Sequence, residues 1–386
     1  MILIKNAHIL SMAGFDFENG CVLINDEGKI EKVAETIDCE CAQVIDVSGG
    51  WLCPGFVDAH CHIGLFNDGM GSEGSDGNEA TANITPQMRA IDSINMRDVN
   101  FREAMEAGVT TLCTGPGSAN VIGGQFVLMK NKGAQRIEDA IIKEPFALKI
   151  AFGENPKRVY GSRKQEPSTR MGTAAVLRQA LEDGKRYKAK VERANGDPEK
   201  MPDYSLKLEA IKGVLDGKYP LKAHAHRADD ILTAIRIANE FGLDYTLDHC
   251  TEGYLIADIL KEENAKVIIG PLFTERSKVE LNQLTNKAAK ILYDAGVKFA
   301  LMTDSPVIPE QYLPVTAAVL VKDGLPEMEA LKAITINAAE ILGVGDRVGS
   351  IEPGKDADIA IFNAHPLDFR AVAQYVLVDG KIVHQK

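Results

Sequence analysis

Two histidines, His60 and His62, stand two positions apart at the end of an apolar run. On a β-strand alternate side chains share a face, so both imidazoles are expected to point the same way. Pro54 and Gly55 mark a break just before this strand, and Asp58 adds a carboxylate to the same face. Imidazoles grouped with a carboxylate are typical ligands of a transition-metal ion.

Further histidines and an aspartate follow at the ends of other predicted strands. His224 and His226 form a second His-x-His pair, His249 ends the run at 243–249, and Asp304 follows an apolar run. An isolated His-x-His pair is more often a structural feature than a ligand set. Here five of the eight histidines stand at strand ends, and this concentration indicates a metal site.

The segment from 56 to 344 alternates helices with strands. Three helices end in glycine and are followed at once by a β-rich run, at 107–112, 241–247 and 295–302. Such repeats predict an α/β fold with a closed (β/α)8 TIM barrel, which keeps its chemistry at the carboxyl ends of its strands. Seven strands can be placed. The eighth is expected between 155 and 220, where two helices are predicted at 172–194 and 204–216.

Short strands without helices open and close the chain. A turn at 25–28 between apolar runs indicates a β-hairpin. The two terminal segments are expected to pair in space. We therefore predict a small β-sandwich domain from residues 1–55 and 345–386, and a hydrolase barrel from residues 56–344.

The composition is that of a globular enzyme, with 45% hydrophobic and 25% charged residues. A net charge of −12 argues against nucleic acid or an anionic membrane as partner. The sequence has no apolar run of membrane-spanning length. Because residues 1–9 alternate early into polar residues, we expect no secretion signal there. Seven scattered cysteines favour reduced thiols, so we expect a cytoplasmic protein. We also expect it to act on a small molecule, and it could form a homo-oligomer.

Several motifs resemble those of the metal-dependent amidohydrolase superfamily: PGFVDAHCHIG at 54–64, both His-x-His pairs, and GSIEPGKDAD at 349–358. The runs GENPKR and HAHRADD resemble an uncharacterised subgroup related to imidazolonepropionase. The resemblance covers the whole chain. It implies hydrolysis of an amide or cyclic amide C–N bond by metal-activated hydroxide. The alternatives are a deaminase of this superfamily and a non-catalytic amidohydrolase-like scaffold, which would lack ligands.

The resemblance also implies a ligand set for one or two divalent ions, zinc in view of the many imidazoles. These ligands are His60, His62, Glu154, His224, His249 and Asp304. Asp304 would in addition carry the proton from water to the leaving nitrogen. His226 would stay free of metal and take part in catalysis by holding the substrate carbonyl.

The bridging ligand is open between two residues. Lys149 and Glu154 stand an odd number of positions apart, so both cannot bridge from one straight strand. Lys149 resembles the carboxylated lysine of dihydroorotase-like members, which has to lose its proton first. Glu154 resembles the glutamate of the N-acetylglucosamine-6-phosphate deacetylase branch. We favour Glu154, because the interval to His224 leaves room for another strand–helix unit.

Basic residues gather near the predicted barrel mouth of this acidic protein. The segment 157–170, which ends in Arg170, joins His226 and Arg227 there. Paired hydrogen bonds from arginine would hold a carboxylate on the substrate. A solvated loop is the competing interpretation of the basic segment.

Overall fold

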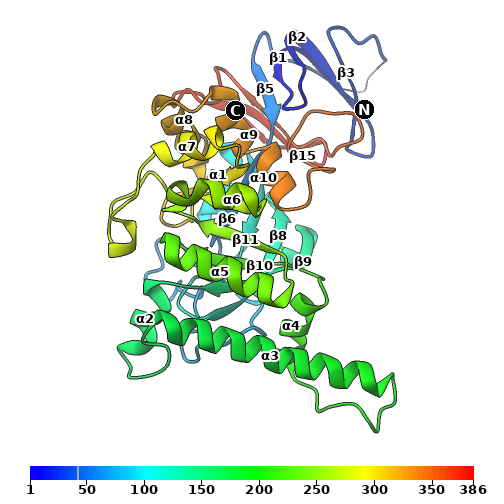
Figure 1. Ribbon diagram of the computed structural model, residues 1–386. Coiled ribbons are helices and arrows are strands. Elements are labelled where there is room, and N and C mark those ends of the chain that lie inside the picture. Colours follow the sequence, from blue (N-terminus) through cyan, green and yellow to red (C-terminus); the bar gives the residue numbers. More distant parts are fainter. Residues whose placement is uncertain (41–42) are drawn as a thin grey trace.

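The computed structural model describes residues 1–40 and 43–386 and contains two eight-stranded sheets. One sheet combines strands from both termini, and the other forms the barrel. Figure 1 shows the terminal strands, blue and red, at one end of the molecule and helix α3 at the other. The predicted TIM barrel with a small terminal β unit is confirmed. The boundaries at 55 and 345 stay a prediction.

The terminal sheet has the order β16-β15-β14-β5-β1-β2-β3, with β4 paired to β1. Its strands are β1 (Ile2–Leu10), β2 (Asp16–Ile24), β3 (Ile30–Ala34), β4 (Gln43–Asp46), β5 (Trp51–Pro54), β14 (Ile359–Phe362), β15 (Ala373–Val378) and β16 (Lys381–Gln385). Antiparallel pairing of β5 with β14 joins the two ends of the chain, and Trp51 lies opposite Phe362. Buried Val22, Leu52 and Ile359 share one apolar cluster in this sheet.

The barrel sheet runs in sequence order from β6 to β13. Its strands are β6 (Phe56–Cys61), β7 (Val109–Thr114), β8 (Ile122–Lys130), β9 (Ile141–Ala151), β10 (Leu221–Ala225), β11 (Tyr245–His249), β12 (Lys266–Ile269) and β13 (Phe299–Leu301). Beyond β13, the Asp304 N–H donates to the His60 carbonyl at 3.3 Å, which brings the first and last strands together. The ring therefore closes at the predicted metal ligands.

The predicted position of the eighth strand is wrong. That strand is β8, which is antiparallel to both β7 and β9. The segment 155–220 instead holds three helices, α2 (Glu154–Gly161), α3 (Arg170–Ala194) and α4 (Leu206–Leu215), of which α3 and α4 match the predicted helices. Strand β8 contains Gly123 and Gly124, and glycine is uncommon inside strands. At Gly124, which has φ +132, a Cβ would lie 2.7 Å from the Met88 carbonyl oxygen, so close backbone approach requires glycine in this strand.

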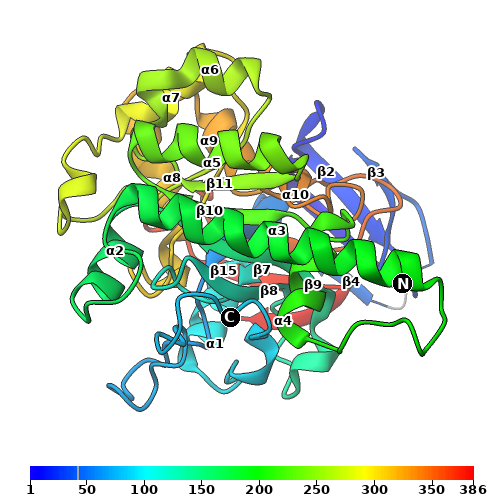
Figure 2. The same cartoon turned by 60° about the horizontal axis from the view of Figure 1, so that its bottom comes forward.

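The remaining α-helices are α1 (Val99–Glu106), α5 (Ala228–Phe241), α6 (Ala257–Glu262), α7 (Lys287–Asp294), α8 (Leu313–Lys322), α9 (Glu327–Ala333) and α10 (Ile336–Ile341). Helix α5 has Asp229 and Asp230 in its first turn and ends at Gly242 with φ +64, a left-handed cap. Figure 2 shows α3 and α5 side by side over the barrel strands. None of the helices in the described part of the chain is long and apolar enough to span a membrane.

The cysteines only partly follow the expectation of reduced thiols. Five are buried free thiols: Cys21, Cys53, Cys61, Cys113 and Cys250. Cys39 is disulfide-bonded, so the expectation is wrong at that residue. Cys41 lies outside the described residues, and the cytoplasmic location stays a prediction.

Candidate metal centre

The first group of candidate ligands lies where the barrel closes. His60 is the penultimate residue of β6, His62 directly follows that strand, and Asp304 comes just after β13. One ligand atom from each lies within 4.8 Å of the others. The Asp304 Oδ1 atom is 3.2 Å from His62 Nε2 and 3.5 Å from His60 Nε2. The spacing suits three donors around one ion.

The second group gathers three imidazoles at the ends of β10 and β11. His224, His226 and His249 offer ligand atoms that also lie within 4.8 Å of one another. Among the described residues, neither ring nitrogen of His224 nor Nε2 of His226 has a hydrogen-bond partner. Buried polar atoms without partners are costly, so a donor set of this kind fits a bound metal.

Backbone carbonyls orient one imidazole in each group. His62 Nδ1 lies 2.6 Å from the Gly115 carbonyl oxygen, and His249 Nδ1 lies 2.8 Å from that of Gly270. A carbonyl oxygen only accepts, so Nδ1 must carry the hydrogen. The lone pair of Nε2 is then directed toward the site, as in histidines that bind metals.

The protonation states also suit metal binding. Burial lowers the pKa of His60 to about 4 and that of His249 to about 3. Burial likewise puts the pKa values of His224 and His226 well below the usual range. Burial alone would raise the pKa of Asp304, but the neighbouring imidazoles lower it well below its usual range. At neutral pH these groups are neutral imidazoles and a carboxylate.

Lys149, on β9, lies beside the first group. Its Nζ is 3.3 Å from His60 Nε2 and 3.5 Å from Asp248 Oδ2, and its side chain is fully buried. Burial lowers the pKa of this lysine to about 8, although the Asp248 carboxylate opposes the shift. Of the two bridging candidates, Lys149 is thus the one that the fold brings to the ligands.

Glu154 belongs to neither ligand group of the described residues. The chain leaves β9 at Ala151, turns at Gly153, and starts α2 with Glu154. The backbone N–H of Glu154 donates to Glu280 Oε2 at 2.9 Å. Glu154 therefore stands at the start of helix α2, beyond the end of β9, and not on the strand itself.

A buried ion pair, which was not among the predicted site residues, contacts the first group. Lys222 Nζ donates to Asp248 Oδ1 at 3.0 Å and to the Ala59 carbonyl oxygen at 3.0 Å. The other carboxylate oxygen, Asp248 Oδ2, is 3.1 Å from His60 Nδ1, which leaves His60 Nε2 for the site. The available signal was spacing, because Lys222 precedes His224 by two positions and shares its strand face.

The two arginines expected to bind substrate are engaged elsewhere. Arg227 Nε donates to Asp229 at 2.9 Å, and Arg170 Nε donates to Asp230 at 3.0 Å. The Arg227 side chain is 41% exposed, and it pairs with a residue of its own α5 turn. In this structure both guanidinium groups are paired with aspartates rather than directed at the histidines.

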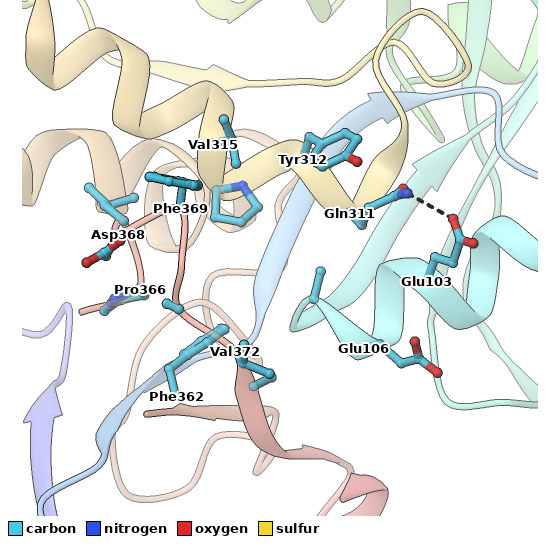
Figure 3. A pocket seen from close by; sticks show the side chains of 15 residues that line it. Glu103, Glu106, Gln311, Tyr312, Val315, Phe362, Pro366, Asp368, Phe369 and Val372 are labelled. Atoms are coloured by element: carbon cyan, nitrogen blue, oxygen red, sulfur yellow. Dashed lines mark hydrogen bonds between the residues drawn. The ribbon is translucent and has the colours of Figure 1, made fainter. Parts of the chain in front are cut away.

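A surface groove between α1 and the segment 362–373 lies apart from these groups. Its lining includes Glu103, Glu106, Tyr312 and Phe369, and none of the candidate metal ligands. Gln311 Nε2 donates to Glu103 Oε2 at 2.8 Å across one edge (Figure 3). This groove does not form part of the candidate metal centre.

Comparisons with known proteins agree with this architecture. The crystal structure of an amidohydrolase from Thermotoga maritima MSB8 is 47% identical, with a TM-score of 0.97 and 100% of both chains covered. Amidohydrolase tasK of Hapsidospora irregularis is 32% identical over 94% of this chain, which spans only 39% of that protein. Imidazolonepropionase of Rhizobium rhizogenes is 24% identical, over 92% of this chain and 89% of that protein.

The family assignment rests on more than single relatives. The Amidohydrolase family profile matches residues 51–383, which include every barrel strand and both ligand groups. The predicted superfamily, its relation to imidazolonepropionase and the enzyme class, a hydrolase of C–N bonds, are confirmed. The superfamily's divalent-metal dependence agrees with two groups that could each hold an ion. The chain belongs to the amidohydrolase family.

Proposed function

We propose that this protein hydrolyses an amide or cyclic amide bond of a small molecule with the help of bound divalent metal. The observation that carries the proposal is the set of buried, neutral imidazoles with unpartnered nitrogens at the ends of β10 and β11. The many imidazoles favour zinc. One ion would be held by His60, His62 and Asp304, and a second by His224 and His249. We add His226 to the second set, although the sequence had led us to expect it free of metal, because its ring nitrogen lies with those of His224 and His249.

A divalent ion, if held by these residues, would supply Lewis-acid chemistry: it would polarise a carbonyl group and lower the pKa of water from 15.7 to about 7. Asp304 would accept a proton from the attacking water and deliver it to the leaving nitrogen. Its Oδ1 lies beside His62 Nε2, and its side chain is 14% exposed, so it can reach a reacting molecule. The similarity to an imidazolonepropionase supports a cyclic amide among the candidate substrates.

We further propose Lys149, carboxylated on Nζ, as the bridging ligand in place of Glu154. The deprotonated amine would add to carbon dioxide, which gives a carbamate and releases one proton. Asp248 is already paired with Lys222 at 3.0 Å. An ammonium group on Lys149 would therefore be a second buried cation, and it would repel a metal ion bound by the ligand groups. A carbamate removes that repulsion and supplies two oxygen donors.

Metal analysis combined with a substrate screen tests the function. The protein should contain one to two equivalents of metal and hydrolyse some member of a library of N-acyl amino acids, dipeptides, hydantoins and lactams. A chelator should abolish hydrolysis, and zinc should restore it. The His60→Ala/His62→Ala variant should lose metal and activity, whereas His384→Ala, on the terminal strand β16, should keep both. Unchanged metal content in the double variant would refute the proposal.

A further inference from the structure

Glu280 is a buried acid that the mechanism above does not use. It lies in a short 3-10 helix (Val279–Leu281) between β12 and α7, and its side chain is 1% exposed. Its Oε2 accepts the Glu154 N–H at 2.9 Å. In the described part of the chain, Oε1 has no hydrogen-bond partner. A buried carboxylate oxygen without a donor costs free energy, so its presence calls for a ligand that supplies one.

The surrounding backbone is shaped to hold this carboxylate. Gly153 has φ +78, and a Cβ there would lie 2.6 Å from Glu280 Oε2 and 3.1 Å from Asp230 Oδ2. Arg170 already pairs with Asp230 at 3.0 Å, so that guanidinium is engaged. The first turn of α2 thus fixes one oxygen of Glu280 and leaves the other free.

The free oxygen faces the second ligand group and a lysine. Glu280 Oε1 lies 3.7 Å from His226 Nε2 and 3.6 Å from Lys278 Nζ, both too long for a hydrogen bond. Lys278 is 25% exposed, so its ammonium group can move, whereas Glu280 is fixed.

We propose that Glu280 and Lys278 bind the free ammonium and carboxylate groups of an α-amino-acid head, whose scissile amide lies further along its side chain. Such a head carries its two charges on one carbon, which matches opposite protein charges 3.6 Å apart. Glu280 Oε1 gains the donor that it lacks, and Lys278 turns from Glu280 to the substrate carboxylate. The inference rests on the proposed function, because it names the substrate class of that site.

Binding measurements separate this inference from hydrolysis. Calorimetric titration of the zinc-loaded protein would compare Nε-acetyl-L-lysine with its Nα-acetylated derivative and with its carboxamide. Loss of either charge should weaken binding at least about tenfold, as expected for a charge-assisted hydrogen bond. Equal affinity for all three compounds, or no binding of any, overturns the inference even if hydrolysis of other amides is found.

Variants assign each charge to its residue. Glu280→Gln should remove the preference for the free ammonium group, and Lys278→Met should remove the preference for the carboxylate. Glu275→Gln, at an exposed position of the same segment, should change neither. Lys278 is partly exposed, so its variant should remain folded even if Glu280→Gln does not. Preferences that persist in the Lys278→Met protein contradict the inference, whereas absence of hydrolysis with these preferences intact contradicts only the proposed function.

Discussion

Two buried clusters of charge differ in how completely their members are paired. At the seam between the barrel and the terminal sheet, Lys130 Nζ lies 2.6 Å from Asp358, 3.0 Å from Asp356 and 3.1 Å from Asp379. Arg347 adds a further contact to Asp356 at 2.8 Å. Each of these charged side chains at the seam therefore forms an ion pair with a side chain of opposite charge.

The cluster at the barrel mouth is incomplete in its hydrogen bonds. Both ring nitrogens of His224 and Oε1 of Glu280 lack hydrogen-bond partners among the described residues. Folding tolerates a buried charge when the protein itself completes its contacts, as at the seam. Where buried polar atoms lack partners within the protein, we expect a bound ion or ligand to supply them. The completeness of these contacts thus distinguishes a structural charge cluster from a binding site.

The largest effect is expected at the mouth, where Lys149→Met should remove both metal and hydrolysis. Methionine fills similar space but cannot form a carbamate. Glu154→Gln should keep the metal, because its side chain belongs to neither ligand group. Elemental analysis of the two purified variants, with bicarbonate added during metal loading, makes the comparison. Metal loss in Glu154→Gln alone would restore Glu154 as the bridging ligand.

At the seam, loss of a charge should cost stability and leave the metal in place. Lys130→Met removes the shared cation from Asp356 and Asp358, and breaking a buried pair in this way costs about 3–5 kcal/mol. Denaturant unfolding would measure the loss. The control is Lys132→Met, which removes a 33% exposed lysine from Asp379 and should cost no more than about 1 kcal/mol. Reduced metal content in the folded Lys130→Met variant would contradict the distinction between a structural cluster at the seam and a binding cluster at the barrel mouth.

A smaller effect should appear in acid. Burial would raise the pKa of Asp356, but Lys130 and Lys29 lower it from 3.8 to about 2. A carboxyl group whose pKa is lower in the folded state stabilises the fold above its unfolded pKa. About 2 kcal/mol should therefore be lost as pH falls from 3.8 to 2. The difference in unfolding free energy between wild type and Asp356→Asn, measured across this range, should shrink accordingly. A constant difference would contradict the assignment.

Much of the fold follows from local sequence patterns. Strand alternation and glycine helix stops predicted the barrel, and the placement of His60, His62, His224 and His249 follows from where strands end. The strand β8 was not predicted because Gly123 and Gly124 have a low preference for strands. Glycine is required at position 124 by a tertiary contact, the close approach of the Met88 backbone. A single sequence does not display such contacts.

The site was predictable only for residues on or next to strands. Glu154 was placed by its spacing, but a turn at Gly153 moves it onto a helix. Arg227 and Arg170 were chosen for their charge, yet Asp229 and Asp230 neutralise them. Pairing of this kind depends on side-chain directions at loop and helix starts, which residue types and spacing do not specify.

The pairing of β5 with β14 sets the order in which the enzyme can be completed during synthesis. Only Gly55 separates β5 from β6, the strand that carries His60. Residues 359–362, which supply one neighbour of β5, follow every barrel strand in the chain. Strand β5, which leads directly into the strand that carries His60, therefore gains this neighbour only after all the barrel strands have been synthesised.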